Sequence, residues 1–210
     1  MRITVFGATG GTGSRLLEQA CAAGHQVTAV VRDPARLTFS HPELSVVRSD
    51  VMDPAAIQPH VAGRDAVVSA IGARSTKAPI TVQTDSTTSI LKAMADAGVR
   101  RFVVVSNSGM LTDGDGPVSK YVVKPILWRF LKHPWTDMGR MEDVVRASEL
   151  DWTIIRPPML TNGPRTAGYR TAVNRNVRGG NRISRADLAD CVLRHLADRD
   201  SIRTAISVAN

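Results

Sequence analysis

Short apolar runs alternate with longer amphipathic segments along the chain. The apolar runs are rich in β-branched residues and predict strands at residues 3–6, 26–31, 44–48, 65–71, 101–106 and 152–156, with a further candidate at 205–208. Most of these runs are continuously apolar, which is typical of parallel strands covered on both faces. The amphipathic segments predict helices at residues 13–25, 53–63, 84–99, 136–150 and 184–198.

Helix-end signals agree with this division of the chain. Gly24 stands where the first helix should end, and Asp53 followed by Pro54 suits the start of the second. Ser184, with an acidic residue three positions later, forms a start similar to a capping box. The alternation of strand and helix predicts an α/β fold with a doubly wound parallel sheet and helices on both faces. We expect one domain over residues 1–210.

Two stretches interrupt the alternation. Residues 107–120 follow the fifth predicted strand and are rich in Gly, Asp and Ser, and residues 156–182 follow the sixth and carry several prolines and glycines. Ligands of open α/β sheets bind outside the carboxyl ends of the strands. These stretches are therefore predicted to form a small substrate-side region, although variable surface loops would have the same composition.

Composition and charge narrow the classes of partner that the protein is expected to bind. The net charge of +8 favours anionic partners, but the basic residues are dispersed, and 4% aromatic residues argue against a stacking platform for single-stranded nucleic acid. No apolar run approaches the roughly 20 residues that cross a bilayer, and the N-terminus does not resemble a signal peptide. We expect a cytoplasmic protein without a membrane or nucleic-acid partner. Cys21 and Cys191 lack metal-ligand spacing, so no metal site is expected.

The most informative motif is the stretch GATGGTG, which follows the first predicted strand and opens a helix. Gly7 permits the tight turn, Gly10 allows a close approach to a pyrophosphate, and Gly13 allows the helix to pack on the sheet. Free amides at the helix N-terminus would face the phosphates, and Thr9 and Thr12 add hydroxyl donors. The motif predicts a Rossmann-type dinucleotide site, with residues 1–110 as the cofactor half and 111–210 completing the sheet and the substrate-side loops.

The end of the second strand favours NADP(H) over NAD(H). Domains that prefer NAD place an acidic residue there for the ribose hydroxyls, whereas this chain has Arg32, with Arg36 four residues later. Two guanidinium groups suit a 2′-phosphate, although the adjacent Asp33 keeps NAD as an alternative cofactor. After the third strand, Asp50 and Val51 are placed to meet the adenine.

Motifs along nearly the whole chain resemble one family. They are GATGGTG, VVRDPARL, DVMDPAAI, DAVVSAIG, VVVSNSG, RMEDVVRASELDWTIIRPPMLTNGP and ISRADLAD, in this order. The chain resembles the NAD(P)H-binding, NmrA-like group of atypical short-chain dehydrogenases/reductases, which includes biliverdin reductase B and bacterial NADH-flavin reductases. Motif and resemblance together imply that the cofactor contacts Gly7, Thr9, Gly10, Gly11, Thr12, Gly13, Arg32, Arg36, Asp50, Val51, Ala70, Ile71, Gly72, Arg74 and Pro157.

The catalytic residues are less clear from the sequence. Short-chain dehydrogenases use a serine with Tyr-x-x-x-Lys, but here Tyr121 is followed by Lys124, and Pro125 holds the expected lysine position. The sequence therefore predicts a surface tyrosine at a helix start or loop rather than a working triad. The polar residues Ser106, Asn107 and Ser108 after the fifth strand are the catalytic candidates, with turn formation as the alternative.

The substrate-side residues suggest a planar acceptor. The candidate pocket residues are Met138, Met159, Leu160, Tyr169 and Arg170, and the two methionines stand where the biliverdin reductase group has histidines, which disfavours biliverdin. The favoured function is an NADPH-dependent reductase of a flavin, quinone or similar acceptor, with flavin as substrate. An NmrA-like NADP(H) sensor without turnover is the alternative, and an epimerase or dehydratase follows it. A monomer or weak homodimer is expected.

Overall fold

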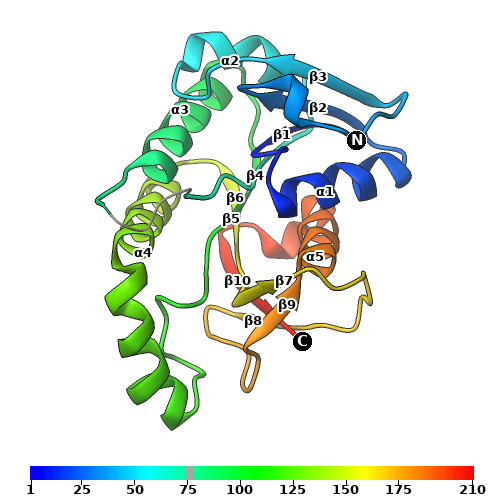
Figure 1. The fold of residues 1–210 in the computed structure, drawn as a ribbon. Helices are drawn as coiled ribbons and strands as arrows, with labels where there is room; N and C mark the ends of the chain where they lie inside the picture. Colours follow the sequence, from blue (N-terminus) through cyan, green and yellow to red (C-terminus); the bar gives the residue numbers. More distant parts are fainter. Residues whose placement is uncertain (74–77) are drawn as a thin grey trace.

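A computed structural model describes residues 1–73 and 78–210. Its main sheet has eight strands in the order β3-β2-β1-β4-β5-β6-β10-β8 (Figure 1). Their bounds are β1 Arg2–Phe6, β2 Gln26–Val31, β3 Leu44–Arg48, β4 Ala66–Ser69, β5 Arg101–Val105, β6 Asp151–Arg156, β8 Arg170–Val173 and β10 Thr204–Ala209. Strand β8 pairs antiparallel with β10, and the other neighbours in this sheet are parallel. The doubly wound sheet predicted from the sequence is confirmed.

Helices cover both faces of the sheet. On one face α1 packs against α5, and on the other α2, α3 and α4 pack in succession (Figure 1). Their bounds are α1 Gly11–Ala22, α2 Pro54–Val61, α3 Val82–Asp96, α4 Lys124–Ala147 and α5 Arg185–Ala197. A second, two-stranded sheet joins β7 (Met159–Thr161) to β9 (Arg182–Ser184), and short turns lie at η1 (Pro34–Arg36), η2 (Ser119–Val123) and η3 (Arg199–Ser201).

Two apolar layers hold the helices onto the sheet. Neighbouring strand residues enter opposite layers: Val5 lies in the core beneath α1 and α5, whereas Phe6 lies in the core beneath α2, α3 and α4. Val67 and Val68 of β4 divide in the same way, so the strands are buried on both faces. This explains why they read as continuous apolar runs rather than as alternating ones.

The strand order reverses between β1 and β4, because the chain adds β2 and β3 on one side and β5 and β6 on the other. In such sheets the loops at the carboxyl ends separate at this point and leave a crevice for a ligand. The loops that follow β1, β4 and β5 therefore meet beside the expected dinucleotide site.

Two parts of the second half differ from the sequence prediction. Helix α4 begins at Lys124, a full three turns before the expected start near residue 136, and the π-helical turn η2 precedes it. Pro125 lies in its first turn, where the missing amide costs no hydrogen bond, and Pro134 is held inside the helix. The stretch 156–182, expected as loop, contributes β7 and β8.

Candidate functional site

The glycine loop after β1 is shaped by backbone contacts that exclude side chains. Gly7 has a φ of 79°, and a Cβ there would lie 2.5 Å from the backbone carbonyl carbon of Ala70. A Cβ on Gly13 would lie 2.2 Å from the carbonyl oxygen of Gly7, and one on Gly11 would lie 2.8 Å from the Arg185 side chain. Only glycine fits at Gly7 and Gly13, where a side chain would collide with backbone, whereas at Gly11 the flexible Arg185 side chain would have to move.

Gly10 differs from its neighbours because its outer side is open. Its amide donates to the Gly7 carbonyl over 3.0 Å, and a Cβ would meet only that oxygen, at 3.2 Å. Helix α1 then begins at Gly11 without a side-chain cap and without an acidic residue in its first turn. The first amides of a helix have no intrahelical acceptor and attract anions. The cradle therefore fits a pyrophosphate, beside the half-buried Thr9 and the buried Thr12.

Two exposed guanidinium groups stand at the carboxyl end of β2. Arg32 directly follows the strand and Arg36 ends the turn η1. Neither pairs with an acidic side chain among the described residues. The Asp33 carboxylate between them accepts a hydrogen bond from the Ala35 amide and so caps its own turn. The cationic pair thus remains available for a phosphate.

The ends of β3 and β4 add the remaining cofactor candidates. Asp50 accepts from the Met52 amide in a tight turn, and Val51 packs beside the α2–α3 core. Ala70 forms the backbone wall opposite Gly7, and Ile71 also borders that core. A Cβ on Gly72 would meet no described atom within 4 Å. Arg74, the last member of the predicted set from this segment, lies outside the described residues.

A buried ion pair supports the ends of β5 and β6. Ser106 donates its hydroxyl to Glu142 Oε1 over 2.7 Å, and Arg156 Nε donates to the same oxygen over 2.8 Å. Burial alone would raise the pKa of Glu142, but the Arg156 guanidinium and the Ser106 hydroxyl together hold it below its usual range. Ser106, a catalytic candidate, is therefore turned inward and braces the two strands rather than facing a ligand.

The next two residues line the chain after β5. Asn107 accepts from the Gly109 amide over 2.8 Å and contacts the Met138 sulfur with its amide nitrogen. Ser108 donates its amide to the Pro157 carbonyl over 2.9 Å, so the loops after β5 and β6 are joined. The Ser108 hydroxyl has no hydrogen-bond partner among the described residues. Ser108 is buried, and among the catalytic candidates its hydroxyl is the one that no described residue engages.

The start of α4 settles the question of a tyrosine–lysine pair. Tyr121 is 69% exposed. Lys124 instead reaches the Asp115 carboxylate over 2.5 Å and the Ser108 carbonyl over 3.2 Å, and it also donates to the Leu111 carbonyl. The prediction that this tyrosine lies on the surface at a helix start is confirmed. Lys124 anchors the loop after β5 rather than lowering the pKa of a tyrosine.

The geometry of this site matches a known family. Residues 7–199 match the model of the family described as NAD(P)H-binding. The match begins at the first glycine of the cradle, directly after β1, and ends beyond α5, so it covers the elements from α1 to α5. The chain belongs to this NAD(P)H-binding family, an atypical group of short-chain dehydrogenases/reductases.

Individual members are similar over nearly their full lengths. YwnB of Bacillus subtilis is 27% identical over 204 residues, which cover 93% of this chain and 92% of that protein. A Burkholderia pseudomallei structure, described as a candidate exported protein, has a TM-score of 0.83 and 29% identity, and the match covers both chains completely. A Streptococcus pneumoniae structure, described as a candidate NADH-flavin reductase, has a TM-score of 0.77 and 25% identity over 100% of this chain and 99% of that one.

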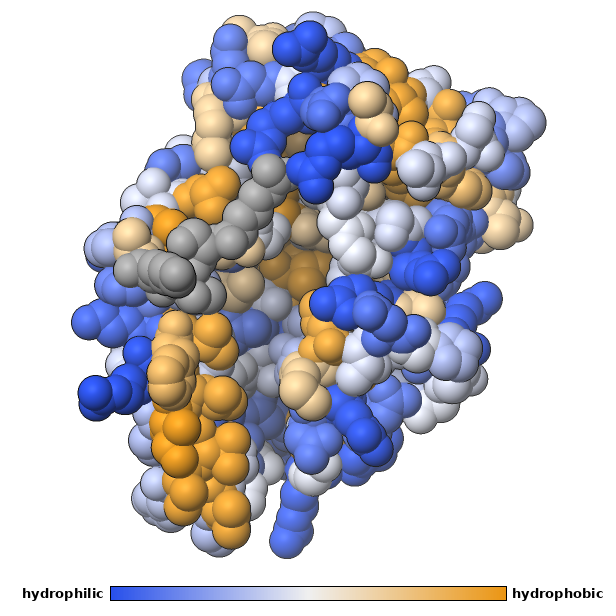
Figure 2. All heavy atoms as spheres, in the orientation of Figure 1, coloured by the Kyte–Doolittle hydropathy of each residue, from blue (hydrophilic) through white to orange (hydrophobic). Residues whose placement is uncertain are grey.

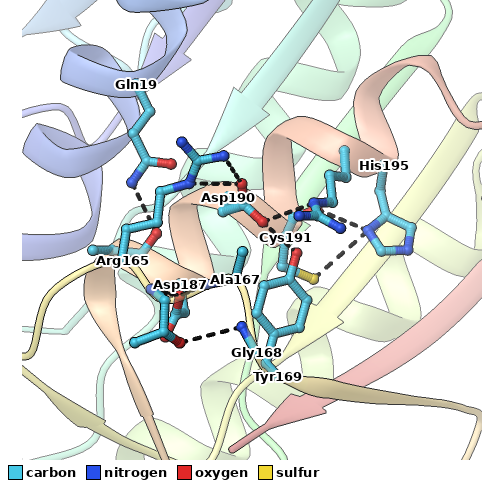
Figure 3. Close-up of polar contacts among 12 residues, drawn as sticks. Gln19, Arg165, Ala167, Gly168, Tyr169, Asp187, Asp190, Cys191 and His195 are labelled. Carbon is cyan, nitrogen blue, oxygen red and sulfur yellow. Dashed lines mark hydrogen bonds and ion pairs between the residues drawn. The ribbon is translucent and has the colours of Figure 1, made fainter.

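The substrate-side candidates of this NAD(P)H-binding protein do not all face the same way. Tyr169 lies against α5, where its hydroxyl donates to Asp190 over 2.6 Å (Figure 3). Burial and this carboxylate raise the pKa of Tyr169. Arg170 donates to the backbone carbonyls of Arg178 and Asn210 on the outer edge of the sheet. The expectation that these two residues close over a substrate therefore has no support in their placement.

The methionine and leucine candidates have mixed surroundings. Met138, on α4, contacts the Asn107 side chain with its sulfur. Met159, at the start of β7, is 65% exposed. Leu160, the next residue, packs against the core beneath α1 and α5. Figure 2 shows the surface hollowed between α4 on the left and the β7–β9 side on the right, with apolar surface at the upper end of the hollow. Met138 and Met159 thus come from elements on its two sides.

Sequence reasoning missed three buried carboxylates that position the site. Glu142 braces Ser106, as described above. Asp137 of α4 accepts from the amides of Gln83 and Thr84, over 2.9 and 3.1 Å, and so caps α3 from outside. Asp187 accepts from the amides of Thr166 and Ala167 in the loop toward β8. In the sequence each of these carboxylates is an acidic residue within a helix. The one signal that could have found them is an acidic residue at a helical position that the apolar pattern predicts to be buried.

The cysteine and histidine of α5 form no reactive centre. Cys191 Sγ lies 3.6 Å from His195 Nδ1, and that ring nitrogen is 2.7 Å from the Cys191 carbonyl oxygen (Figure 3). Burial raises the pKa of Cys191 to about 12, so the thiol is protonated at neutral pH. Among the described residues there is no group of three His, Cys, Asp or Glu side chains able to hold a metal ion.

Proposed function

We propose that this protein is an NADPH-dependent reductase that transfers hydride to a flavin, a quinone or a similar planar acceptor. The observation that carries the proposal is the combination of the open glycine cradle with two guanidinium groups at the end of β2 that pair with no acidic side chain in the described part of the chain. The cradle suits the pyrophosphate, and Arg32 with Arg36 suits the 2′-phosphate that distinguishes NADPH from NADH.

Bound NADPH would supply a hydride from its nicotinamide ring. The residues of the chain would then act chiefly by position. Pro157 and the backbone around Ser108 join the loops after β5 and β6, so they fix the floor on which the ring would lie. The free Ser108 hydroxyl can donate a hydrogen bond to the carboxamide or to the acceptor. The buried Glu142–Arg156 pair keeps both loops in register.

The proposed acceptor class rests on which groups near the site could transfer a proton. Tyr121 is largely exposed to solvent, and Lys124 is held by Asp115. A ketone or alcohol substrate needs an acid or base at the reacting oxygen. A flavin or quinone needs less help, because the reduced acceptor is a stable anion that takes its proton from water. The sulfur of Met138 and the apolar end of the hollow would suit the flat face of such a ring.

The same observation favours one second candidate, an NADP(H) sensor without turnover. A site that holds the dinucleotide but lacks a tyrosine–lysine pair would serve binding alone. A sensor is expected to bind NADP⁺ and NADPH with different affinities and to oxidise NADPH with none of the acceptors. The location in the cytoplasm, expected from the sequence, remains a prediction for both candidates.

The test measures NADPH oxidation by its nicotinamide absorbance against FMN, FAD, riboflavin and soluble quinones. We expect saturable turnover that is strongly reduced in Arg32→Glu and retained in Arg175→Glu, a matched charge reversal at an exposed arginine of the outer loop. Tight NADPH binding without oxidation of any acceptor would reject the reductase in favour of the sensor. An absence of NADPH binding would reject both.

A further inference from the structure

The first half of α4 and the turn before it expose an unusual amount of apolar surface. Tyr121 is 69% exposed, Phe130 is 65% exposed, and every residue from 116 to 132 is partly or fully exposed. The exposed large apolar side chains of this segment are Val118, Tyr121, Val122, Val123, Ile126, Leu127, Trp128 and Phe130. Figure 2 shows an apolar surface over the lower end of α4, which extends beyond the sheet in Figure 1.

A contiguous apolar surface of this kind marks an interaction site rather than ordinary surface variation. Val122, Ile126 and Phe130 follow one another at four-residue spacing and so lie along one side of the helix. On the opposite side of the helix Trp128, itself 46% exposed, meets the buried Trp135 with ring centroids 6.0 Å apart. The apolar stripe therefore faces away from the fold, and folding of this chain alone gives it no function.

The charge of the same segment is of one sign. Residues 116–136 contain four basic residues and neither Asp nor Glu. Lys124 is used internally by Asp115, whereas Lys120, Arg129 and Lys132 are exposed and form no ion pair with a described residue. An apolar stripe bordered by unpaired cations, with Trp and Tyr among its exposed side chains, is the composition of helices that lie in a bilayer interface.

We propose that residues 118–132, which we term the apolar segment, dock on the surface of an anionic lipid bilayer. The stripe would enter the boundary between headgroups and acyl chains, and Lys120, Arg129 and Lys132 would meet anionic headgroups. A symmetric dimer through the same segment would instead bring two sets of unpaired cations together without an acidic residue to neutralise them. Charge complementarity therefore selects the lipid surface over a second copy.

The sequence analysis expected no membrane partner because it searched for a spanning helix. In the described part of the chain, no helix has the length and apolarity needed to cross a bilayer. Docking on the surface does not require one, since it needs only a single apolar face and nearby cations. The docking surface also adjoins the site, because Lys124 connects the apolar segment to the carbonyls of Ser108 and Leu111.

The test is flotation of the full-length protein with phosphatidylcholine vesicles that contain or lack phosphatidylglycerol. We expect the wild type to float only with the anionic vesicles and to be released by high salt. The double variant Ile126→Ser/Phe130→Ser should lose binding, and Arg129→Glu should weaken it about tenfold. Two control variants should bind as the wild type does. They are Val173→Ser, at an exposed apolar position of β8, and Arg175→Glu, at an exposed basic position just after β8.

Two outcomes would overturn the proposal. The first is a wild-type protein that stays in the soluble fraction with anionic vesicles, or a double variant that floats unchanged. The second is a stable dimer in light scattering that Phe130→Ser dissociates while vesicles bind neither protein, which would assign the face to a second copy. Circular dichroism of each variant verifies folding. Oxidation of NADPH by a soluble quinone is measured in parallel, so a failure of the proposed reductase activity leaves the docking result interpretable.

Discussion

The two halves of the site are built from different materials. The cofactor side, from Gly7 to Gly13, consists almost entirely of backbone, and its shape is set by positions that no Cβ can occupy. The side proposed for the acceptor, called the acceptor side below, consists of long side chains from α4, β6 and the loop after β5, held by ion pairs and hydrogen bonds. The cofactor side therefore depends on the absence of side chains at its glycines, and the acceptor side depends on pairs of residues far apart in the sequence.

Their electrostatics differ in the same sense. Arg32 and Arg36 are exposed and have no acidic partner among the described residues, so their charge is available to a ligand. Arg156 is buried, and the Glu142 carboxylate neutralises its charge. An exposed cation costs the fold little and serves binding, whereas a buried pair serves position and is expensive to break. Substitutions in the two halves should accordingly affect different measurements.

The largest effect is expected on the acceptor side, from Glu142→Ala. The variant leaves the buried Arg156 guanidinium without its partner, which should lower the free energy of unfolding by about 3–5 kcal/mol. For a chain of this size that corresponds to a fall in Tm of roughly 10 °C or more in a thermal melt. Glu149→Ala removes the exposed pair with Arg203 and is the control, with an expected loss of under about 1 kcal/mol. Equal losses in both variants would contradict the role of burial.

The same pair predicts a dependence on pH. The pKa of Glu142 lies below its ordinary value of 4.5, so its stabilising contribution is complete above pH 4.5 and disappears as the pH falls through the lowered value. The stability difference between wild type and Glu142→Gln, measured by urea unfolding, should therefore be constant above that pH and shrink below it. A gap that grows on acidification would show that the pKa is shifted in the other direction.

On the cofactor side, Gly10→Ala should remove binding and leave the fold intact. The added Cβ meets only the Gly7 carbonyl oxygen, at 3.2 Å, but it occupies the open side where the pyrophosphate would approach. We expect the Kd for NADPH to rise about 100-fold, while Tm changes little. The control is Gly116→Ala, where a Cβ would meet no atom within 4 Å, and both its Tm and its Kd should be those of the wild type. A loss of Tm in Gly10→Ala as large as its loss of binding would contradict the separation.

The double variant Arg32→Ala/Arg36→Ala sharpens the comparison within the cofactor side. Without the two guanidinium groups the 2′-phosphate loses its charged partners, and the Kd for NADPH should rise about 10- to 100-fold. The Kd for NADH, which lacks that phosphate, should stay within about twofold, since the glycine cradle is unchanged. Titration of the quenched tryptophan fluorescence or calorimetry measures both. Parallel losses for the two dinucleotides would place the arginines elsewhere than at the 2′-phosphate.

The sequence predicted the cofactor half far better than the acceptor half, and the reason is physical. A glycine at φ 79° or one that would collide with a carbonyl oxygen is required by local geometry, so the spacing of Gly7, Gly10 and Gly13 carries the structure within seven residues. The continuous strands are predictable for a similar reason, because burial on both faces requires apolar side chains at every position.

The acceptor half depends on contacts that local patterns do not record. Glu142 reads as one charge on an amphipathic helix until β6 brings Arg156 beside it. The early start of α4 was missed because Pro125 and Pro134 indicate an interruption, although Pro125 lies in the first turn, where its missing amide costs no hydrogen bond, and Pro134 is buried within the helix. Tyr169 was predicted to line the substrate pocket from its place after β6, but the buried Asp190 of α5 holds its hydroxyl. For Glu142 and Tyr169 a partner more than eight residues away decided the outcome.

The smallest effect is expected from Tyr121→Phe. In a working tyrosine–lysine site this change removes the proton donor and lowers kcat by orders of magnitude. Here Tyr121 is exposed and Lys124 is bound to Asp115, so kcat and KM for NADPH oxidation should remain within about twofold of the wild type across the pH range. Ser108→Ala is the comparison, because its hydroxyl has no hydrogen-bond partner among the described residues and, under the proposed function, its loss should lower kcat several-fold. A large fall for Tyr121→Phe would mean that α4 rearranges when the dinucleotide binds and brings the tyrosine to the acceptor side after all.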